Sequence, residues 1–222
     1  MRPETKSPPP EPRTPAAGPS FTPRLLAVEH ALAQALGQHH PRRIPGTQAK
    51  PAAVLMPLRD DGEVVSMIFT KRTATLPDHP GQISFPGGRA ETTDPDLAAT
   101  ALRETHEEIG VAPWEVRLLA RQDQVVTVTN YLVTPYLGMV AGEARFHLNT
   151  WEVARLVEVP FVKVLDPAAY QQVVIDWRGV KLPQTALIQG EDVIWGATHR
   201  MLQNFLAALG PEGLARVARA AV

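Results

Sequence analysis

The chain has 222 residues, of which 44% are apolar, a formal net charge of −1 and no cysteine. This length and composition are typical of one globular domain with extensions, and the near-neutral charge indicates neither a nucleic-acid nor a membrane partner. Without cysteine the chain has no disulfides, thiolate metal ligands or cysteine nucleophiles. The sequence shows no apolar stretch of membrane-spanning length and no apolar signal segment, so we expect a cytoplasmic protein.

The N-terminal part of the sequence differs from the rest. Residues 1–22 are rich in proline and poor in apolar side chains, which predicts a flexible tail, with a partner-binding polyproline arm as the alternative. Thr22 and Pro23 suit an N-cap and a first helical position, and Gly37 suits a helix end. We therefore expect a helix at 23–36 and a linker to residue 49, ahead of the main domain at 50–222.

The main domain contains more strand patterns than helix patterns. Residues 52–58 and 64–70 are apolar, β-branched runs on either side of an Asp-Asp-Gly turn, which predicts a β-hairpin. Further strands are predicted at 116–120, 131–140, 156–160, 171–177 and 185–189, and helices at 95–109, at 196–209 and after Pro211. The pattern predicts an α+β fold with a mixed sheet between helices.

The predicted helix 95–109 carries Glu104, Glu107 and Glu108 close together. At 100° per residue the three carboxylates span an arc of about 100° beside the apolar stripe of the helix. Their repulsion costs a few tenths of a kcal/mol per pair, and a divalent cation with oxygen ligands, such as Mg²⁺, relieves it. A solvated acidic face is the alternative. The apolar stripe and the FPGG turn at 85–88 favour a metal site.

Residues at the two ends of this helix support its assignment. Asp94-Pro95 is the expected start, because the Asp side chain can cap free N–H groups and Pro suits the first turn. Gly110 is the expected end. Arg103 lies four residues before Glu107, so it is expected to hold that carboxylate in place.

From Gly88 to Val111 the chain resembles the signature of the Nudix hydrolases, G-x5-E-x7-R-E-U-x-E-E-x-G-U, in which U is aliphatic. Thr105 replaces one aliphatic residue, the spacing from Gly88 to Arg103 is one residue longer, and Asp94 represents the upstream glutamate. The matching positions are Arg103, Glu104, Glu107, Glu108, Gly110 and Val111. The resemblance implies a Nudix α/β/α sandwich.

The resemblance also implies roles for individual residues. Glu104 or Glu107 doubles as general base, and Arg103 orients a glutamate. Glu152 and Glu158 are candidates for an additional acid outside the signature, with exposed charges at the ends of elements as the alternative. The implied ligands of Mg²⁺, or of Mn²⁺ in its place, are Glu104, Glu107 and Glu108.

A second stretch narrows the resemblance to one branch of the family. FTKRT at 69–73, followed by Gly81 and FPGG at 85–88, is similar to the pattern L-L-T-x-R-[SA]-x3-R-x3-G-x3-F-P-G-G of the coenzyme A pyrophosphatases. Pro77 stands where that pattern has Arg. Three later segments also look like this branch: VTP at 133–135, EVP at 158–160 and IWGAT at 194–198.

The branch implies a small-molecule substrate and a reaction. The substrate is coenzyme A or a thioester of it, and the products are adenosine 3′,5′-bisphosphate and 4′-phosphopantetheine or its acyl form. Arg72 and Lys71 are the candidates for a phosphate contact, and the N–H groups of Gly87 and Gly88 are expected to face phosphate oxygens. The alternatives are an ADP-ribose or dinucleotide pyrophosphatase, which Pro77 favours, and a non-catalytic nucleotide-sensing module. The oligomeric state stays open.

Overall fold

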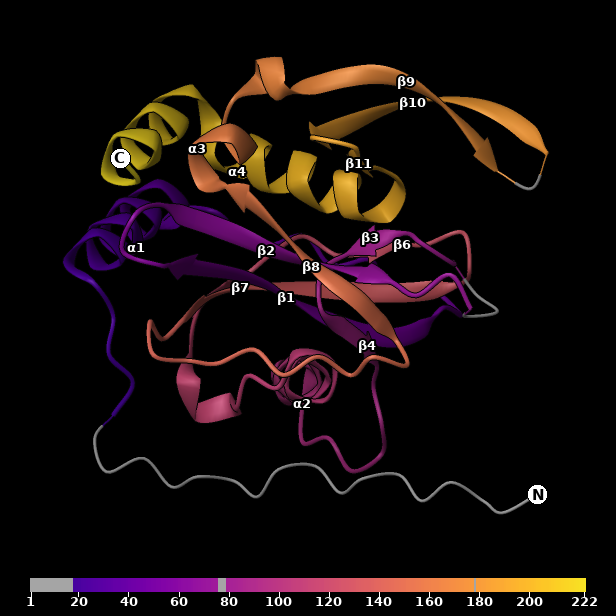
Figure 1. Cartoon of the computed structure of the whole chain (residues 1–222), viewed down its shortest axis with the longest axis horizontal. Coiled ribbons are helices and arrows are strands. Elements are labelled where there is room, and N and C mark those ends of the chain that lie inside the picture. The colour runs from indigo at the N-terminus through magenta and orange to yellow at the C-terminus, as the bar shows by residue number, and fades with distance from the viewer. Residues whose placement is uncertain (1–17, 76–78, 178) are drawn as a thin grey trace.

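In the computed structural model, which describes residues 18–75, 79–177 and 179–222, a mixed β-sheet lies between two layers of helices (Figure 1). Helix α2 covers one face, and α1, α3 and α4 cover the other (Figure 1). The helices are α1 (Pro23–Leu36), α2 (Leu97–Ile109), α3 (Phe161–Val164) and α4 (Gly196–Ala220), with 3-10 turns at Pro113–Glu115 and Pro167–Ala169. The predicted α+β fold is confirmed. Pro77 and residues 1–17 of the predicted tail lie outside the described residues.

The main sheet has the order β3-β2-β1-β7-β5, with β8 on β2, β4 on β1 and β6 on β7. Among the described residues, only the β1–β7 pairing in this sheet is parallel. Its strands are β1 (Lys50–Asp60), β2 (Val65–Arg72), β3 (Ile83–Ser84), β4 (Gly87–Arg89), β5 (Val116–Arg121), β6 (Val125–Val126), β7 (Tyr131–Val140) and β8 (Val153–Pro160). The predicted hairpin is present as β1 and β2, and the predicted strand at 131–140 has the observed bounds of β7.

Strands β1 and β2 pair only near their connecting turn. Leu58 on β1 lies opposite Met67 on β2, whereas farther along β1 the partner of Ala53 is Gly88 on β4. The FPGG turn continues this contact, because the N–H of Leu55 donates to the carbonyl of Pro86 (2.9 Å). The glycine-rich turn therefore fills the space where β1 and β2 diverge.

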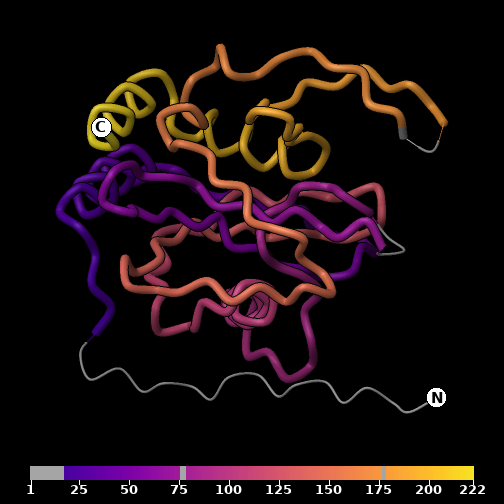
Figure 2. Tube along the Cα trace, viewed as in Figure 1, coloured from indigo at the N-terminus to yellow at the C-terminus, as the bar shows by residue number. Residues whose placement is uncertain are grey.

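Helix α1 packs into the same core as the main sheet, although the sequence placed it ahead of the main domain. The Oγ1 of Thr22 accepts from the N–H of Leu25 (3.1 Å), which confirms the predicted N-cap. Arg24 donates to both carboxylate oxygens of the buried Asp60 at the end of β1 (2.9 and 3.0 Å). Figure 2 shows α1 beside the C-terminal part of α4, which it contacts. The buried residues of α1 are Leu25, Val28, Ala31, Leu32 and Leu36.

Helix α2 begins later than the sequence predicted. Its N-cap is Asp96, whose side chain accepts from the N–H of Ala99 (2.8 Å), and not Asp94. The prediction was wrong because the carboxylate of Asp94 is engaged by the guanidinium of Arg103 instead. The predicted end is confirmed, since Gly110 has φ of 76°, the left-handed conformation that glycine adopts at little cost.

Helix α4 lies between the main sheet and a smaller antiparallel sheet (Figure 1). Gly210 has φ of 62° and ψ of 173° directly before Pro211, so α4 consists of two helical segments, as the sequence predicted. The smaller sheet consists of β9 (Tyr170–Trp177), β10 (Val180–Gln189) and β11 (Asp192–Ile194). No helix in the described part of the chain is both long and apolar enough to cross a membrane.

Strand β8 contains one irregular position that bears on the site described below. Lys71 on β2 lies opposite Arg155, but the next residue, Arg72, lies opposite Val153. Ala154 is therefore an extra residue on β8, in the manner of a β-bulge. The turn at 149–152 leads directly into this irregular part of the strand.

Candidate active site

The signature glutamates lie where three segments meet: the end of β2, the turn at 85–88 and the C-terminal half of α2. Glu108 is 5% exposed, and its Oε2 lies 3.5 Å from the Oγ1 of Thr70 on β2. Thr70 was matched in the sequence pattern but given no role. A strand of period two places Thr70 and Arg72 on the same face, which was the signal available in the sequence.

The two glycines of the turn lie against backbone and carboxylate atoms that leave no room for a side chain. A Cβ on Gly88 would lie 2.5 Å from the Oε2 of Glu104. Gly87 has φ of 152°, and a Cβ there would collide with the carbonyl oxygen of Ala53. The backbone of Gly87 acts on the carboxylate of Glu108 and lowers its pKa, against the effect of burial. The glycines therefore bring backbone donors and the two acidic side chains close together.

Arg103 connects the upstream loop to the acidic cluster. Its Nε and Nη2 donate to the two carboxylate oxygens of Asp94 (2.9 and 3.0 Å). Its Nη1 donates to Glu104 (3.0 Å) and to Glu107 (3.3 Å), which confirms the predicted i,i+4 pair. Asp94 also accepts from the hydroxyl of Thr100 (2.8 Å). One aspartate thus anchors the guanidinium that holds two of the signature glutamates.

Burial and mutual repulsion shift the pKa values of the two inner glutamates. Burial raises the pKa of Glu108 to about 8; the charges of Glu104 and Glu152 add to the rise, and Arg72 opposes it. Burial likewise raises the pKa of Glu104, against the lowering effect of Arg103. Asp94 shifts the other way, because the hydrogen bonds from Arg103 hold its pKa well below the usual range. For both inner acids, therefore, burial and mutual repulsion outweigh the positive charges of Arg103 and Arg72.

The donor chemistry of this cluster fits a hard divalent cation, because its oxygen atoms repel one another and are partly buried. In the described residues, however, no three His, Asp or Glu side chains converge on a common point where they could hold a metal ion. Glu104 and Glu107 both accept from Arg103, and the side chain of Glu107 is 56% exposed. A metal site formed by all three glutamates thus stays a prediction. It requires the side chain of Glu107 to turn towards Glu104 and Glu108.

The structure separates the two predicted phosphate contacts. Arg72 is on the side of the acidic cluster, where its charge acts on Glu108. Lys71, its neighbour in the strand, forms an ion pair with the buried Asp192 of the smaller sheet (3.1 Å). Neighbouring residues of a strand point to opposite faces, so Lys71 is not brought to the carboxylates.

The two predicted additional acids are also separated. The charge of Glu152 acts on both Glu104 and Glu108, so Glu152 belongs to the surroundings of the cluster. Glu158 lies on β8 opposite Ile68 and is exposed, and its carbonyl oxygen accepts from Gln189 (3.3 Å). The acidic cluster is therefore under the influence of Glu152, whereas Glu158 lies on the exposed side of β8.

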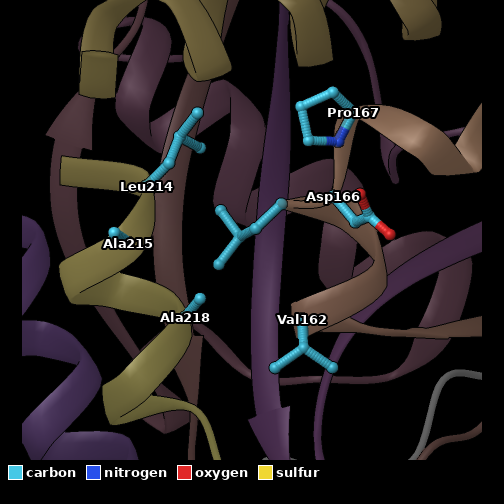
Figure 3. A pocket seen from close by; sticks show the side chains of 7 residues that line it. Val162, Asp166, Pro167, Leu214, Ala215 and Ala218 are labelled. Atoms are coloured by element: carbon cyan, nitrogen blue, oxygen red, sulfur yellow. The ribbon is translucent and has the colours of Figure 1, made fainter. Parts of the chain in front are cut away.

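An open hollow with a volume of about 260 Å³ lies away from these carboxylates (Figure 3). It is formed between the segment that follows β8 and the second half of α4, on the face of the main sheet opposite α2 (Figures 1 and 3). Its lining is mostly aliphatic and consists of Val162, Leu165, Asp166, Pro167, Leu214, Ala215 and Ala218. None of the predicted site residues belongs to it.

Comparison with known proteins identifies the family of the chain. The NUDIX domain model matches residues 49–177. The uncharacterized Nudix hydrolase NudL of Enterobacter sp. (strain 638) is 33% identical over 159 residues, which cover 72% of this chain and 82% of that protein. NudL of Pectobacterium atrosepticum, also uncharacterized, is 32% identical over 182 residues, covering 82% and 94%.

Among solved structures, a MutT NUDIX hydrolase from Burkholderia pseudomallei aligns with a TM-score of 0.42 and 19% identity, over 71% of this chain and 98% of that one. The family model and the sequence relatives establish the assignment. The chain belongs to the Nudix hydrolases, enzymes that act on phosphorus-containing acid anhydrides and generally use divalent metal ions.

Proposed function

We propose that this chain hydrolyses the pyrophosphate of coenzyme A or its thioesters in a Mg²⁺-dependent reaction. The observation that carries the reaction type is the pair of carboxylates beside the Gly87–Gly88 backbone. Glu108 is buried and Glu104 is partly buried, and the pKa of each is raised. The observation that favours coenzyme A is the sequence pattern FTKRT…G…FPGG around the same site. The choice of coenzyme A rests on this pattern alone, because carboxylates at the scissile bond do not contact the groups attached to the two ends of the pyrophosphate.

In this proposal each residue of the cluster has a defined task. Glu104, Glu107 and Glu108 would hold the metal, which would supply charge neutralisation of the pyrophosphate and a water molecule activated for attack on phosphorus. Asp94 fixes Arg103, and Arg103 orients Glu104 and Glu107. Glu104 and Glu107 are the candidates for the general base within the signature, and Glu152 is the candidate outside it.

Arg72 is the proposed contact to a substrate phosphate. Its planar guanidinium matches phosphate geometry, and its charge already acts within the acidic cluster. Because the charge of Arg72 acts on Glu108, Arg72 is well placed to bind a substrate phosphate that lies at the acidic cluster together with the metal. Lys71, paired with Asp192, provides a matched comparison from the same strand.

The test compares kcat/KM for coenzyme A, dephospho-coenzyme A and ADP-ribose at saturating Mg²⁺. Coenzyme A should lead by at least about tenfold, or about 1.4 kcal/mol. Arg72→Ala should reduce this lead, whereas Lys71→Gln should leave it unchanged. A preference for ADP-ribose would refute the assignment to coenzyme A and leave the Nudix reaction type in place.

A further inference from the structure

Trp151 exposes most of its side chain to solvent. It is 75% exposed, whereas Trp114 is 38% exposed. A tryptophan side chain can bury 150–250 Å² on folding, and each Å² of apolar surface withdrawn from water contributes about 25 cal/mol. Leaving this indole in water forgoes a large part of that gain, and most of its surface is accessible to a ligand.

The turn that carries Trp151 is held by hydrogen bonds at both ends. The N–H of Trp151 donates to the Oδ1 of Asn149 (3.3 Å), and its carbonyl accepts from the Oγ1 of Thr73 (2.9 Å). The N–H of Thr73 also donates to the carbonyl of Glu152 (2.9 Å). These bonds attach the turn to the chain just beyond β2, so the indole is presented from a fixed backbone.

The same turn is attached to the acidic helix. The N–H of Asn149 donates to the carbonyl of Glu108, the last but one residue of α2 (2.9 Å). Glu152, which follows Trp151 directly, acts electrostatically on Glu104 and Glu108. The turn that carries the exposed indole is therefore attached to the end of α2, and Trp151 precedes a residue that belongs to the surroundings of the carboxylate cluster.

We propose that Trp151 stacks on the heteroaromatic base of the nucleotide half of the substrate. This inference rests on the proposed function to the extent that the substrate is a nucleoside diphosphate derivative. A nucleoside diphosphate has two parts that such a site can bind. Its base offers a flat π-face to an aromatic ring, and its diphosphate binds at the acidic cluster. Stacking of a base on an aromatic side chain strengthens binding and tolerates any base.

The hollow of Figure 3 does not compete for this role. It lies on the other face of the main sheet, and its lining is aliphatic apart from Asp166. A base bound there would be separated from the carboxylates by the sheet itself, whereas a base on Trp151 is separated from Glu108 only by the short turn at 149–151.

The test measures binding to the full-length protein in the presence of Mg²⁺ by titration calorimetry. The two probes are ADP, which carries a base, and inorganic pyrophosphate, which does not. Trp151→Ala should weaken ADP about tenfold, or about 1.4 kcal/mol, and leave the affinity for pyrophosphate unchanged. Trp151→Phe should retain most of the affinity for ADP, because a phenyl ring still stacks. Trp114→Ala is the matched control and should change neither probe.

Two results would overturn the inference: unchanged ADP binding in Trp151→Ala, or an equal loss of both probes in that variant. The last would mean that the substitution disturbs the turn and not base recognition. The proposed function fails independently. An enzyme that prefers ADP-ribose but needs Trp151 to bind ADP refutes the choice of coenzyme A and supports stacking. An enzyme that prefers coenzyme A but binds ADP equally well without Trp151 supports the choice of coenzyme A and refutes stacking.

Discussion

Replacing Asp94 by Asn tests whether the loop before α2 controls the acidic cluster. The substitution keeps the shape of the side chain but removes its charge. It also turns one of the two acceptors for Arg103 into a donor, so that one of the bonds of 2.9 and 3.0 Å is lost. A hydrogen bond to a charged group contributes about 1.5–3 kcal/mol, and this carboxylate is largely buried, with 6% of its side chain exposed.

The expected result is a loss of stability together with a loss of turnover. The melting temperature should fall by about 3–12 °C, since each kcal/mol shifts it by about 2–4 °C in a protein of this size. Because Arg103 holds Glu104 and Glu107, we expect kcat to fall about 10- to 100-fold, or about 1.4–2.8 kcal/mol, with KM nearly unchanged. The assays are thermal unfolding of the metal-free protein and initial rates across a Mg²⁺ titration.

Asp96→Asn is the matched control, two residues farther along. Asp96 caps α2 through the N–H of Ala99, and Asn is as good an N-cap as Asp, so neither stability nor turnover should change much. The reasoning fails if Asp94→Asn lowers the melting temperature but keeps the wild-type kcat. In that case the Asp94–Arg103 pair supports the loop and does not position the glutamates.

Three further substitutions have distinct expected outcomes. Gly88→Ala places a Cβ 2.5 Å from the movable carboxylate of Glu104, so initial rates should fall at least about tenfold while the melting temperature changes little; unchanged rates would contradict the contact. Asp60→Asn should lower the melting temperature by about 2–4 °C at pH 7. The pKa of Asp60 is lowered in the fold, so its stabilising effect is present above the ordinary pKa of about 3.9, and the difference between variant and wild type should disappear as the pH falls below that value. Glu108→Gln should cut Mg²⁺-supported turnover about a thousandfold, or about 4 kcal/mol. Because the pKa of Glu108 is raised to about 8, the metal-free wild type should lose stability as the pH rises from about 5 to 8 and the variant should lose less; equal pH profiles would contradict the raised pKa.

The parts of the fold that could be predicted from the sequence are those with long periodic patterns. Strand β7 has ten residues and was predicted with its observed bounds, and the end of α2 follows from Gly110. Strands β3, β4, β6 and β11 have two or three residues each, too few to show a period, and they were missed. Two of them, β3 and β4, flank the turn that completes the acidic cluster, so helix periodicity could group the three glutamates but could not show how the turn packs against them.

The errors within the site arose from contacts between residues distant in the sequence. The sequence around Asp94 predicts a helix cap. It gives no sign that Arg103, nine residues later, donates to both of its carboxylate oxygens. Lys71 and Arg72 read as one basic pair, although alternation along the strand could have separated them. The pairing of Lys71 with Asp192, which lies 121 residues later, had no signal in the sequence.

The extra residue on β8 has a consequence for how this enzyme is compared with its relatives. An additional residue in one strand reverses the faces of the residues on one side of it relative to the other. Ala154 follows Trp151 and Glu152 so closely that their direction depends on whether that extra residue is present. In a relative that lacks it, a glutamate or an aromatic residue aligned with either position would point elsewhere. Whether two residues at this edge of the site are equivalent should therefore be judged from the strand pairing of each structure. Identical residues in a sequence alignment are insufficient evidence.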